Sequence, residues 1–142
     1  MAQVTQIFNA DTTLNREFLL YLSPVQAGFP SAADDYLDRK IDLNEHLIQH
    51  PAATFFVKVK GDSMRGVGIY SGDMLIVDRS KEAQNNSIVV AILNGEFTVK
   101  RLQKKDGKIS LVAENPNYKP IEIVSSMDFE VWGVVLHSIR SF

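Results

Sequence analysis

From residue 54 onward, apolar and polar residues alternate with a period of two, and this alternation restricts the fold more than any other feature. Successive side chains of a β-strand point to opposite faces of a sheet, so the pattern predicts strands. We expect them at 54–60, 73–79, 87–93, 96–102, 108–114, 120–124 and 129–139. Asn94-Gly95 predicts a two-residue hairpin, and Asp106-Gly107 and Asn115-Pro116-Asn117 predict further turns. The sequence therefore predicts a mainly β fold with antiparallel, partly closed sheets.

The first 30 residues have a different character from the rest. A polar beginning leads to an apolar patch at 18–22, and two prolines and a glycine then follow between residues 24 and 30. Proline and glycine disfavour helix. We expect residues 1–30 to form an extended N-terminal arm and residues 31–142 to form a β-rich domain.

Two short helices are expected where the arm gives way to the strands. Ser31, with an acidic residue three positions later, has the pattern of a helix start and predicts a helix over 32–39. Asp42 and Glu45 repeat this pattern and predict a second helix over 43–48.

Composition argues against several classes of protein. The net charge is −2 with both signs mixed, whereas a protein that binds nucleic acid more often carries a basic face. The absence of cysteine excludes disulfides and cysteine-based zinc sites, and it fits a reducing cytoplasm. Neither a signal peptide nor a membrane-spanning apolar run is expected. His46 and His50 have metal-ligand spacing, but no third histidine or nearby cysteine supports a site, so we expect no metal and no cofactor.

Lys100 stands in the middle of the predicted strand 96–102. A lysine on a strand is usually a solvated edge residue, but this one shares a face with Leu102. If that face is covered, loss of water favours the neutral amine and can lower the lysine pKa by ~3–5 units. A neutral amine can take a proton from a serine hydroxyl, as in serine–lysine pairs.

Ser63 is the candidate partner of this lysine. It lies in Gly61-Asp62-Ser63-Met64, directly after the first predicted strand, where Gly61 allows a sharp turn. A serine in such a turn is usually structural, so the motif acquires meaning only together with Lys100. No histidine–aspartate pair is evident near Ser63, and Lys100 is the only base that the motifs suggest.

Three stretches resemble the LexA/UmuD family of self-cleaving serine peptidases. They are FPSAADDYLDRKIDLNEHLIQHPAATFFVKVKGDSM, SGDMLIVDRS and GEFTVKRL, and the resemblance extends from about residue 28 to about residue 137. It implies the C-terminal peptidase fold of that family, with Ser63 as nucleophile and Lys100 as general base. The separation of 37 residues between them is also what the family shows.

The resemblance also implies a cleavage site in the arm. The family cuts itself at a bond between a small residue and glycine, which here would be Ala27–Gly28. LexA and phage repressors have Ala-Gly at this place and UmuD has Cys-Gly, so the chain departs from UmuD but stays within the wider family. Small side chains let one backbone approach another closely, and glycine permits unusual conformations.

Partners follow from the resemblance alone. In the family, a RecA filament on single-stranded DNA promotes self-cleavage during the SOS response. The shortened protein then joins a UmuC-like Y-family DNA polymerase for translesion synthesis, and members form homodimers. LexA-type repressors carry an N-terminal helix-turn-helix domain, which about 30 residues with two prolines cannot hold, so sequence-specific DNA binding is not expected.

Two other interpretations remain open. The chain could be a non-catalytic binding module of the same fold, in which Ser63 and Lys100 no longer react. It could also resemble signal peptidases, which use serine and lysine as well, but such an enzyme should have a membrane anchor, and none is expected here.

Overall fold

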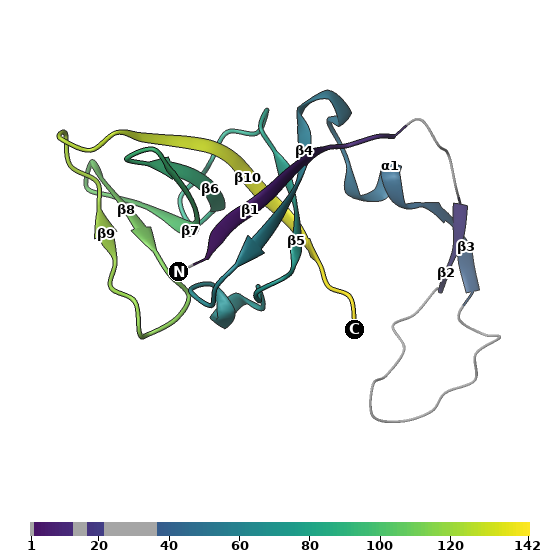
Figure 1. The fold of residues 1–142 in the computed structure, drawn as a ribbon. Coiled ribbons are helices and arrows are strands. Elements are labelled where there is room, and N and C mark those ends of the chain that lie inside the picture. Colours follow the sequence, from purple (N-terminus) through teal and green to yellow (C-terminus); the bar gives the residue numbers. More distant parts are fainter. Residues whose placement is uncertain (1, 13–16, 22–36) are drawn as a thin grey trace. The chain divides into compact units, whose positions relative to one another are not determined.

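The computed structural model describes residues 2–12, 17–21 and 37–142. The chain divides into two compact units, one made of Met1–Ala10 with Ala52–Phe142 and the other of Asp11–Pro51. The larger unit, called the β unit below, contains an antiparallel eight-stranded sheet (Figure 1). Its strands, in chain order, are β1 (Gln3–Asn9), β4 (Thr54–Lys60), β5 (Met74–Asp78), β6 (Ile88–Leu93), β7 (Glu96–Lys105), β8 (Lys108–Val112), β9 (Ile121–Glu122) and β10 (Phe129–Ile139).

The predicted fold class is confirmed: the protein is mainly β, and its strands form a half-barrel. Each of the seven predicted strands is present, with ends that differ by at most a few residues. The hairpin residues Asn94 and Gly95 have φ of 49° and 82°, and Asp106 and Gly107 have φ of 52° and 74°. Two consecutive left-handed residues match the twist of a tight hairpin, and Asn-Gly and Asp-Gly adopt this conformation readily, which is why they predicted these turns.

Strand β10 joins the two halves of the sheet. The order is β1-β4-β5-β10-β6-β7-β8-β9, so β10 pairs with β6 along its first half and with β5 along its second (Figure 1). Register shifts at Val131/Gly133 and Val135/His137 interrupt these ladders. Such irregularities increase bending and twist. Gly133 lies at the first of them, and an added Cβ would stand 2.5 Å from the Val77 side chain.

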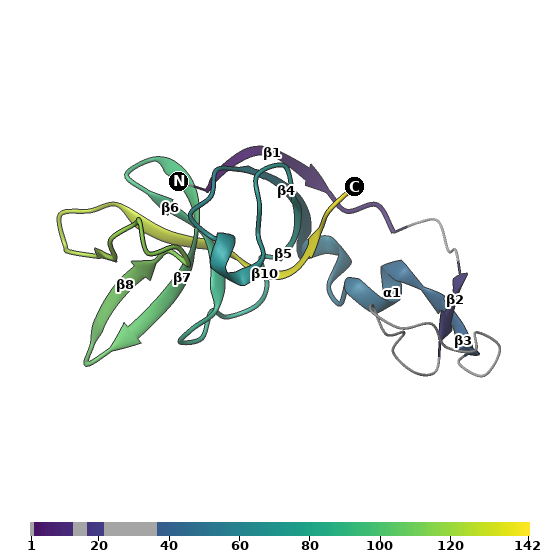
Figure 2. The same cartoon turned by 90° about the horizontal axis from the view of Figure 1, so that it is seen from below.

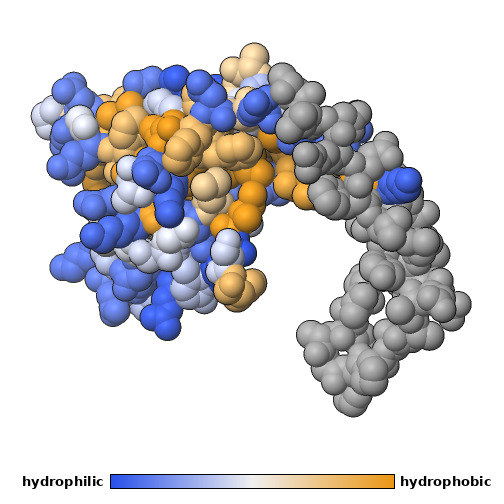
Figure 3. Space-filling view, turned by 45° about the vertical axis from the view of Figure 1, so that its right-hand side comes forward, coloured by the Kyte–Doolittle hydropathy of each residue, from blue (hydrophilic) through white to orange (hydrophobic). Residues whose placement is uncertain are grey.

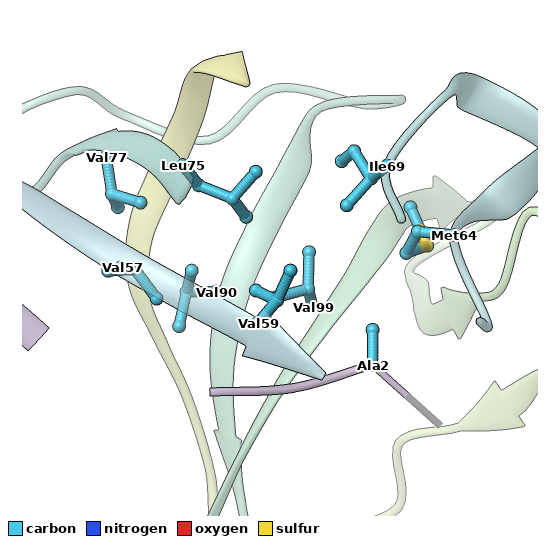
Figure 4. Close-up of a cluster of buried hydrophobic side chains, with 9 residues drawn as sticks. All are labelled: Ala2, Val57, Val59, Met64, Ile69, Leu75, Val77, Val90 and Val99. Atoms are coloured by element: carbon cyan, nitrogen blue, oxygen red, sulfur yellow. The ribbon is translucent and has the colours of Figure 1, made fainter. Parts of the chain in front are cut away.

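The N-terminal strand closes the curve of the sheet. β1 pairs with β4 at one end of the strand order, yet the carbonyl of Ala2, just before it, accepts a hydrogen bond from the Val99 N–H of β7. The inside of this curve is filled by apolar side chains from distant parts of the sequence (Figure 4). The cluster consists of Ala2, Val57, Val59, Met64, Ile69, Leu75, Val77, Val90 and Val99.

A second core cluster covers the other face of the sheet. It contains Val89, Ala91, Leu102 and Leu111. Val90 belongs to the first cluster, so successive residues of β6 are buried on opposite faces, which accounts for the unbroken apolar run in that strand. The β7–β8 hairpin projects away from β1 and β4 (Figure 2).

Hydrophobic residues also reach the surface. Figure 3 shows a band of them across the β unit, with hydrophilic residues on both sides. Large hydrophobic residues of this unit with substantial exposure are Ile7, Phe8, Tyr70, Val124, Ile139 and Phe142.

The smaller unit contains β2 (Glu17–Tyr21) paired with β3 (Leu37–Asp42), followed by α1 (Leu43–Leu47). The predicted helix over 43–48 is confirmed: Asp42 caps it by accepting a hydrogen bond from the Asn44 N–H at 2.9 Å. The predicted helix over 32–39 is wrong for its last three residues, which belong to β3. Pairing with β2 overrides the local helix-start signal there. The arm boundary at residue 30 lies outside the described residues and stays a prediction.

Candidate active site

Ser63 stands in the tight loop that leaves β4. Gly61 opens the loop with a φ of 104°, a conformation that glycine adopts without strain. Met64, the residue after the serine, is fully buried in the first core cluster, and a short 3-10 helix, η3 (Arg65–Val67), follows it. Ser63 itself is fully buried. The loop is therefore a packed structure that fixes the position of the serine hydroxyl.

Lys100 reaches this hydroxyl from β7. Its Nζ lies 3.0 Å from Ser63 Oγ, 3.1 Å from Thr98 Oγ1 and 3.3 Å from the Val99 carbonyl oxygen. A neutral amine has two N–H groups and one lone pair. The N–H groups can donate to Thr98 and Val99, which leaves the lone pair to accept the hydroxyl proton of Ser63.

Burial sets the charge of Lys100. The residue is only 3% exposed, and loss of water lowers the pKa of its amine from 10.5 to about 8. The physical cause is that a charged ammonium depends on hydration more than a neutral amine does. The condition set out from the sequence, that this face of the strand is covered, is therefore met, and an amine with a pKa of about 8 can accept a proton near neutral pH.

The N-terminal segment occupies the space above the two side chains. The Ala2 N–H donates to Ser63 Oγ at 2.7 Å. The Ala2 carbonyl accepts from the Val99 N–H at 3.2 Å and from the Thr98 hydroxyl at 3.4 Å. Ala2 is 1% exposed, so its backbone fills the immediate approach to the serine.

A second set of contacts ties the Ser63 loop to the turn after β8. Asp62 accepts a hydrogen bond from the Tyr118 hydroxyl at 2.5 Å through its side chain and one from the Asn115 amide at 3.0 Å through its backbone carbonyl. The Tyr118 hydrogen bond lowers the pKa of the Asp62 carboxyl. The Gly66 N–H also donates to the Glu114 carbonyl at 2.6 Å. Two separated segments are thereby held against each other beside the serine.

Two hollows lie next to these residues. One of about 280 Å³ includes Thr98 and the start of β1 and is lined by Gln3, Val4, Leu93, Glu96, Phe97, Thr98 and Ile121. Another of about 430 Å³ includes Asp62 and the Glu114–Asn117 turn. A larger hollow of about 590 Å³ is lined partly by Asp73 and Arg140, but by neither Ser63 nor Lys100. The two smaller hollows are not lined by Ser63 or Lys100 either, but the first borders Thr98 and the second borders Asp62.

The structure brings together Ser63 and Lys100, whereas Ala27 and Gly28 lie outside the described residues. Asp73 is buried and bonded to Arg140, with Nε–Oδ1 and Nη2–Oδ2 distances of 2.8 and 2.7 Å. His46 lies in α1, which ends at Leu47, so His50 lies beyond the helix. Within the described residues, no group of three potential His, Cys, Asp or Glu metal ligands occurs.

Thr98, Tyr118 and Ala2 were not identified from the sequence. Thr98 lies two residues before Lys100 on the same predicted face, and this spacing could have indicated its contact. Tyr118 and Ala2 reach the site through tertiary contacts that no local pattern marks.

Comparison with known proteins identifies the family. Residues 20–136 match the family described as Peptidase S24-like. The chain belongs to this family. It is 43% identical over 122 residues to protein SamA of Salmonella typhimurium, covering 86% of each chain. It is 42% identical over 121 residues to protein MucA of Escherichia coli, covering 84% of this chain and 82% of MucA.

A LexA repressor is also similar to this S24-like chain. The Bordetella parapertussis protein is 41% identical over 117 residues, which cover 82% of the present chain but 54% of the repressor. The S24 family comprises self-cleaving serine peptidases, and these relatives support a role related to the SOS response. In the ranges that the structure describes, no helix combines the length and apolar character needed to cross a bilayer.

Proposed function

We propose that this S24-family chain is a UmuD-type peptidase that cuts its own Ala27–Gly28 bond by means of Ser63 and Lys100. The observation that carries the proposal is the 3.0 Å contact between Lys100 Nζ and Ser63 Oγ in a buried setting. It supplies a nucleophile and a base within hydrogen-bond reach, which is the geometric requirement for serine activation.

The reaction begins with proton transfer. Neutral Lys100 takes the hydroxyl proton of Ser63, and Oγ attacks the carbonyl carbon of Ala27. Backbone N–H groups of the Ser63 loop stabilise the developing oxyanion. Lys100 then returns the proton to the Gly28 nitrogen as the peptide bond breaks, which leaves residues 1–27 esterified to Ser63.

Water completes the cycle. Lys100 accepts a proton from a water molecule, which attacks the ester carbonyl, and the proton then returns to Ser63 Oγ as the ester bond breaks. The products are residues 1–27 and residues 28–142. Thr98 and the Val99 carbonyl hold the amine toward Ser63 through both half-reactions, since each offers an acceptor to its N–H groups.

The cellular role follows from the family resemblance. A RecA filament on single-stranded DNA promotes cleavage in the cytoplasm, and the shortened homodimer joins a UmuC-like Y-family polymerase for translesion synthesis. The similarity to SamA, MucA and a LexA repressor supports a function in the SOS response.

Self-cleavage of the purified chain tests the catalytic proposal. We expect a fragment that begins at Gly28, identified by N-terminal sequencing, with a rate about tenfold higher at pH 10 than at pH 7. Only about a tenth of an amine with a pKa of about 8 is neutral at pH 7.

Variants of Ser63 and Lys100 distinguish a loss of catalysis from a general effect of substitution. Ser63→Ala and Lys100→Ala should abolish the fragment, whereas Ser141→Ala and Lys105→Ala, at exposed positions, should cleave like the parent. A chain that stays intact at pH 10 even with a RecA filament added would instead support the non-catalytic binding module.

A further inference from the structure

The chain's own N-terminal strand lies where a bound peptide must pass. The Ala2 N–H is 2.7 Å from Ser63 Oγ, and the Ala2 carbonyl is bonded to Val99 of β7. From this point β1 continues as an added strand on the edge of β4, with Gln3 opposite Lys60 and Asn9 opposite Phe55. Backbone pairing along a sheet edge is a general way of binding extended peptides.

Occupation by Ala2 excludes a substrate from the serine. A reacting carbonyl carbon must stand about 3–3.5 Å from the attacking oxygen. The Ala2 nitrogen already lies closer than this, and its N–H engages a lone pair of Oγ. A second backbone cannot fit into the same space, so substrate and N-terminal strand exclude each other.

The side chain of Ala2 also fits the cleft closely. It is 1% exposed, and Figure 4 shows it directed into the cluster that contains Val59, Val99 and Met64. Interiors are packed with few voids, so this subsite accepts a methyl group and little more. A small apolar side chain beside the nucleophile is also what a cleavage bond after Ala27 requires.

Little of this N-terminal strand is buried. Residues Gln3 and Thr5–Asn9 are exposed and Val4 is half-buried, so Ala2 is the one fully buried anchor in the described part of this segment. A register shift between Val4 and Gln6 interrupts the ladder with β4. β1 is also the edge strand of the sheet, with one neighbour along its length.

We propose that residues 2–9 form a self-inhibitory strand, which binds the catalytic cleft as a pseudosubstrate and must leave before the cleavage segment enters. This inference rests on the proposed function and adds a regulatory step to the same site. It predicts that the rate of self-cleavage is set by the release of β1 as well as by the charge of Lys100.

A reversible disulfide provides the test. Gln6 and Lys58 are paired across β1 and β4 and both are exposed, and the natural chain has no cysteine. In the double variant Gln6→Cys/Lys58→Cys, mild oxidation should link the two strands, since directly opposed residues share one face of the sheet. We expect self-cleavage at pH 10 to be at least tenfold slower in the oxidised protein and to recover when a reductant is added.

A control variant places the disulfide in the β7–β8 hairpin instead of between β1 and β4. Lys105 and Lys108 are also paired and exposed, at the tip of the β7–β8 hairpin, and Lys105→Cys/Lys108→Cys should cleave equally fast in both redox states. Equal rates for oxidised and reduced Gln6→Cys/Lys58→Cys, with the disulfide shown by mass spectrometry, would overturn the inference. Failure of the two cysteines to pair would overturn it as well.

A binding measurement separates this inference from the proposed chemistry. Ser63→Ala is added to the same cysteine pair, and a labelled synthetic peptide with the sequence of residues 22–33 is titrated. Reduced protein should bind this peptide at least tenfold more tightly than oxidised protein, whether or not the parent chain cuts itself. Indistinguishable binding in the two states counts against a self-inhibitory strand, whereas absent cleavage with this difference intact counts only against the catalytic proposal.

Discussion

The Lys100 amine is removed from water, and this has a consequence for stability. An unfolded chain holds the lysine proton up to a pKa near 10.5, but the folded protein holds it only up to about 8. Below pH 8 both states are protonated and the full desolvation penalty, about 3 kcal/mol, opposes folding. Between pH 8 and 10.5 the unfolded state binds more protons, so stability rises with pH. Above 10.5 both amines are neutral and the penalty is gone.

Lys100→Met should therefore stabilise the protein at neutral pH. Methionine has a similar length and no charge, and we expect a gain of about 1–2 kcal/mol at pH 7 after the loss of hydrogen bonds to Ser63 and Thr98. The gain should shrink to zero or reverse by pH 11. Urea unfolding at both pH values measures it, with Lys105→Met as an exposed control. A gain that does not depend on pH would contradict the buried-ammonium explanation.

At the residue scale, the burial of Lys100 could be predicted from the sequence, because its neighbours on the strand indicate which face is covered. A period of two places Leu102 on the same face, and a buried Leu102 implies a dry Lys100. No such rule locates Ala2. Its contact with Ser63 joins residues 61 positions apart and arises only when β1 has paired with β4.

At the scale of elements, turns were easier to predict than strand partners. Asn94-Gly95 and Asp106-Gly107 specify hairpins through local backbone preferences alone. β1 has no comparable signal, because all of its residues but Val4 are exposed and give no clear apolar alternation. β3 was mistaken for a helix at residues 37–39 for a related reason: the start signal is local, whereas its pairing with β2 is not.

The close approach of η3 to the segment after β8 gives a prediction at this scale. A Cβ on Gly66 would stand 2.5 Å from the Glu114 carbonyl oxygen, a backbone atom that cannot rotate away. Gly66→Ala should lower the free energy of unfolding by about 1–3 kcal/mol and slow self-cleavage by shifting the Ser63 loop. Urea unfolding and the rate of fragment release measure these effects.

Gly107→Ala is the comparison for Gly66→Ala. An added Cβ there meets nothing within 4 Å, and the φ of 74° introduces strain far from the serine. Gly107→Ala should lower the free energy of unfolding but leave the rate of self-cleavage unchanged. Unchanged stability and rate in Gly66→Ala would show that the two segments can separate without consequence.

At the scale of the whole molecule, residues from both ends of the described chain make contacts with residues far away in the sequence. Ala2 contacts the serine, and Arg140, near the C-terminus, binds Asp73, the Gly68 carbonyl and the face of the Tyr70 ring. The sequence indicated one β-rich domain beginning near residue 31. It could not indicate that a strand from the predicted arm completes the sheet, because that depends on long-range pairing rather than on composition.

Arg140→Gln tests the C-terminal contact. The Arg140 hydrogen bonds lower the pKa of Asp73 below its ordinary 3.8, so the pair stabilises the fold above that pH and loses its effect as acid protonates the folded carboxyl. We expect a loss of about 1–2 kcal/mol at pH 7 and a smaller loss at pH 3, below the ordinary pKa of the carboxyl, both measured by urea unfolding. Lys105→Gln, an exposed lysine at a hairpin tip, should show no loss. An equal loss at both pH values would exclude the ion pair as its origin.

The position of Ala2 also bears on how this serine should be studied with chemical reagents. An electrophilic inhibitor arriving from solvent meets a backbone amide before it meets Oγ. Slow labelling of Ser63 would then report how rarely Ala2 moves away from the serine. It would not show that the hydroxyl itself is unreactive. Compound screens are better run on protein whose first nine residues have been detached from the sheet edge.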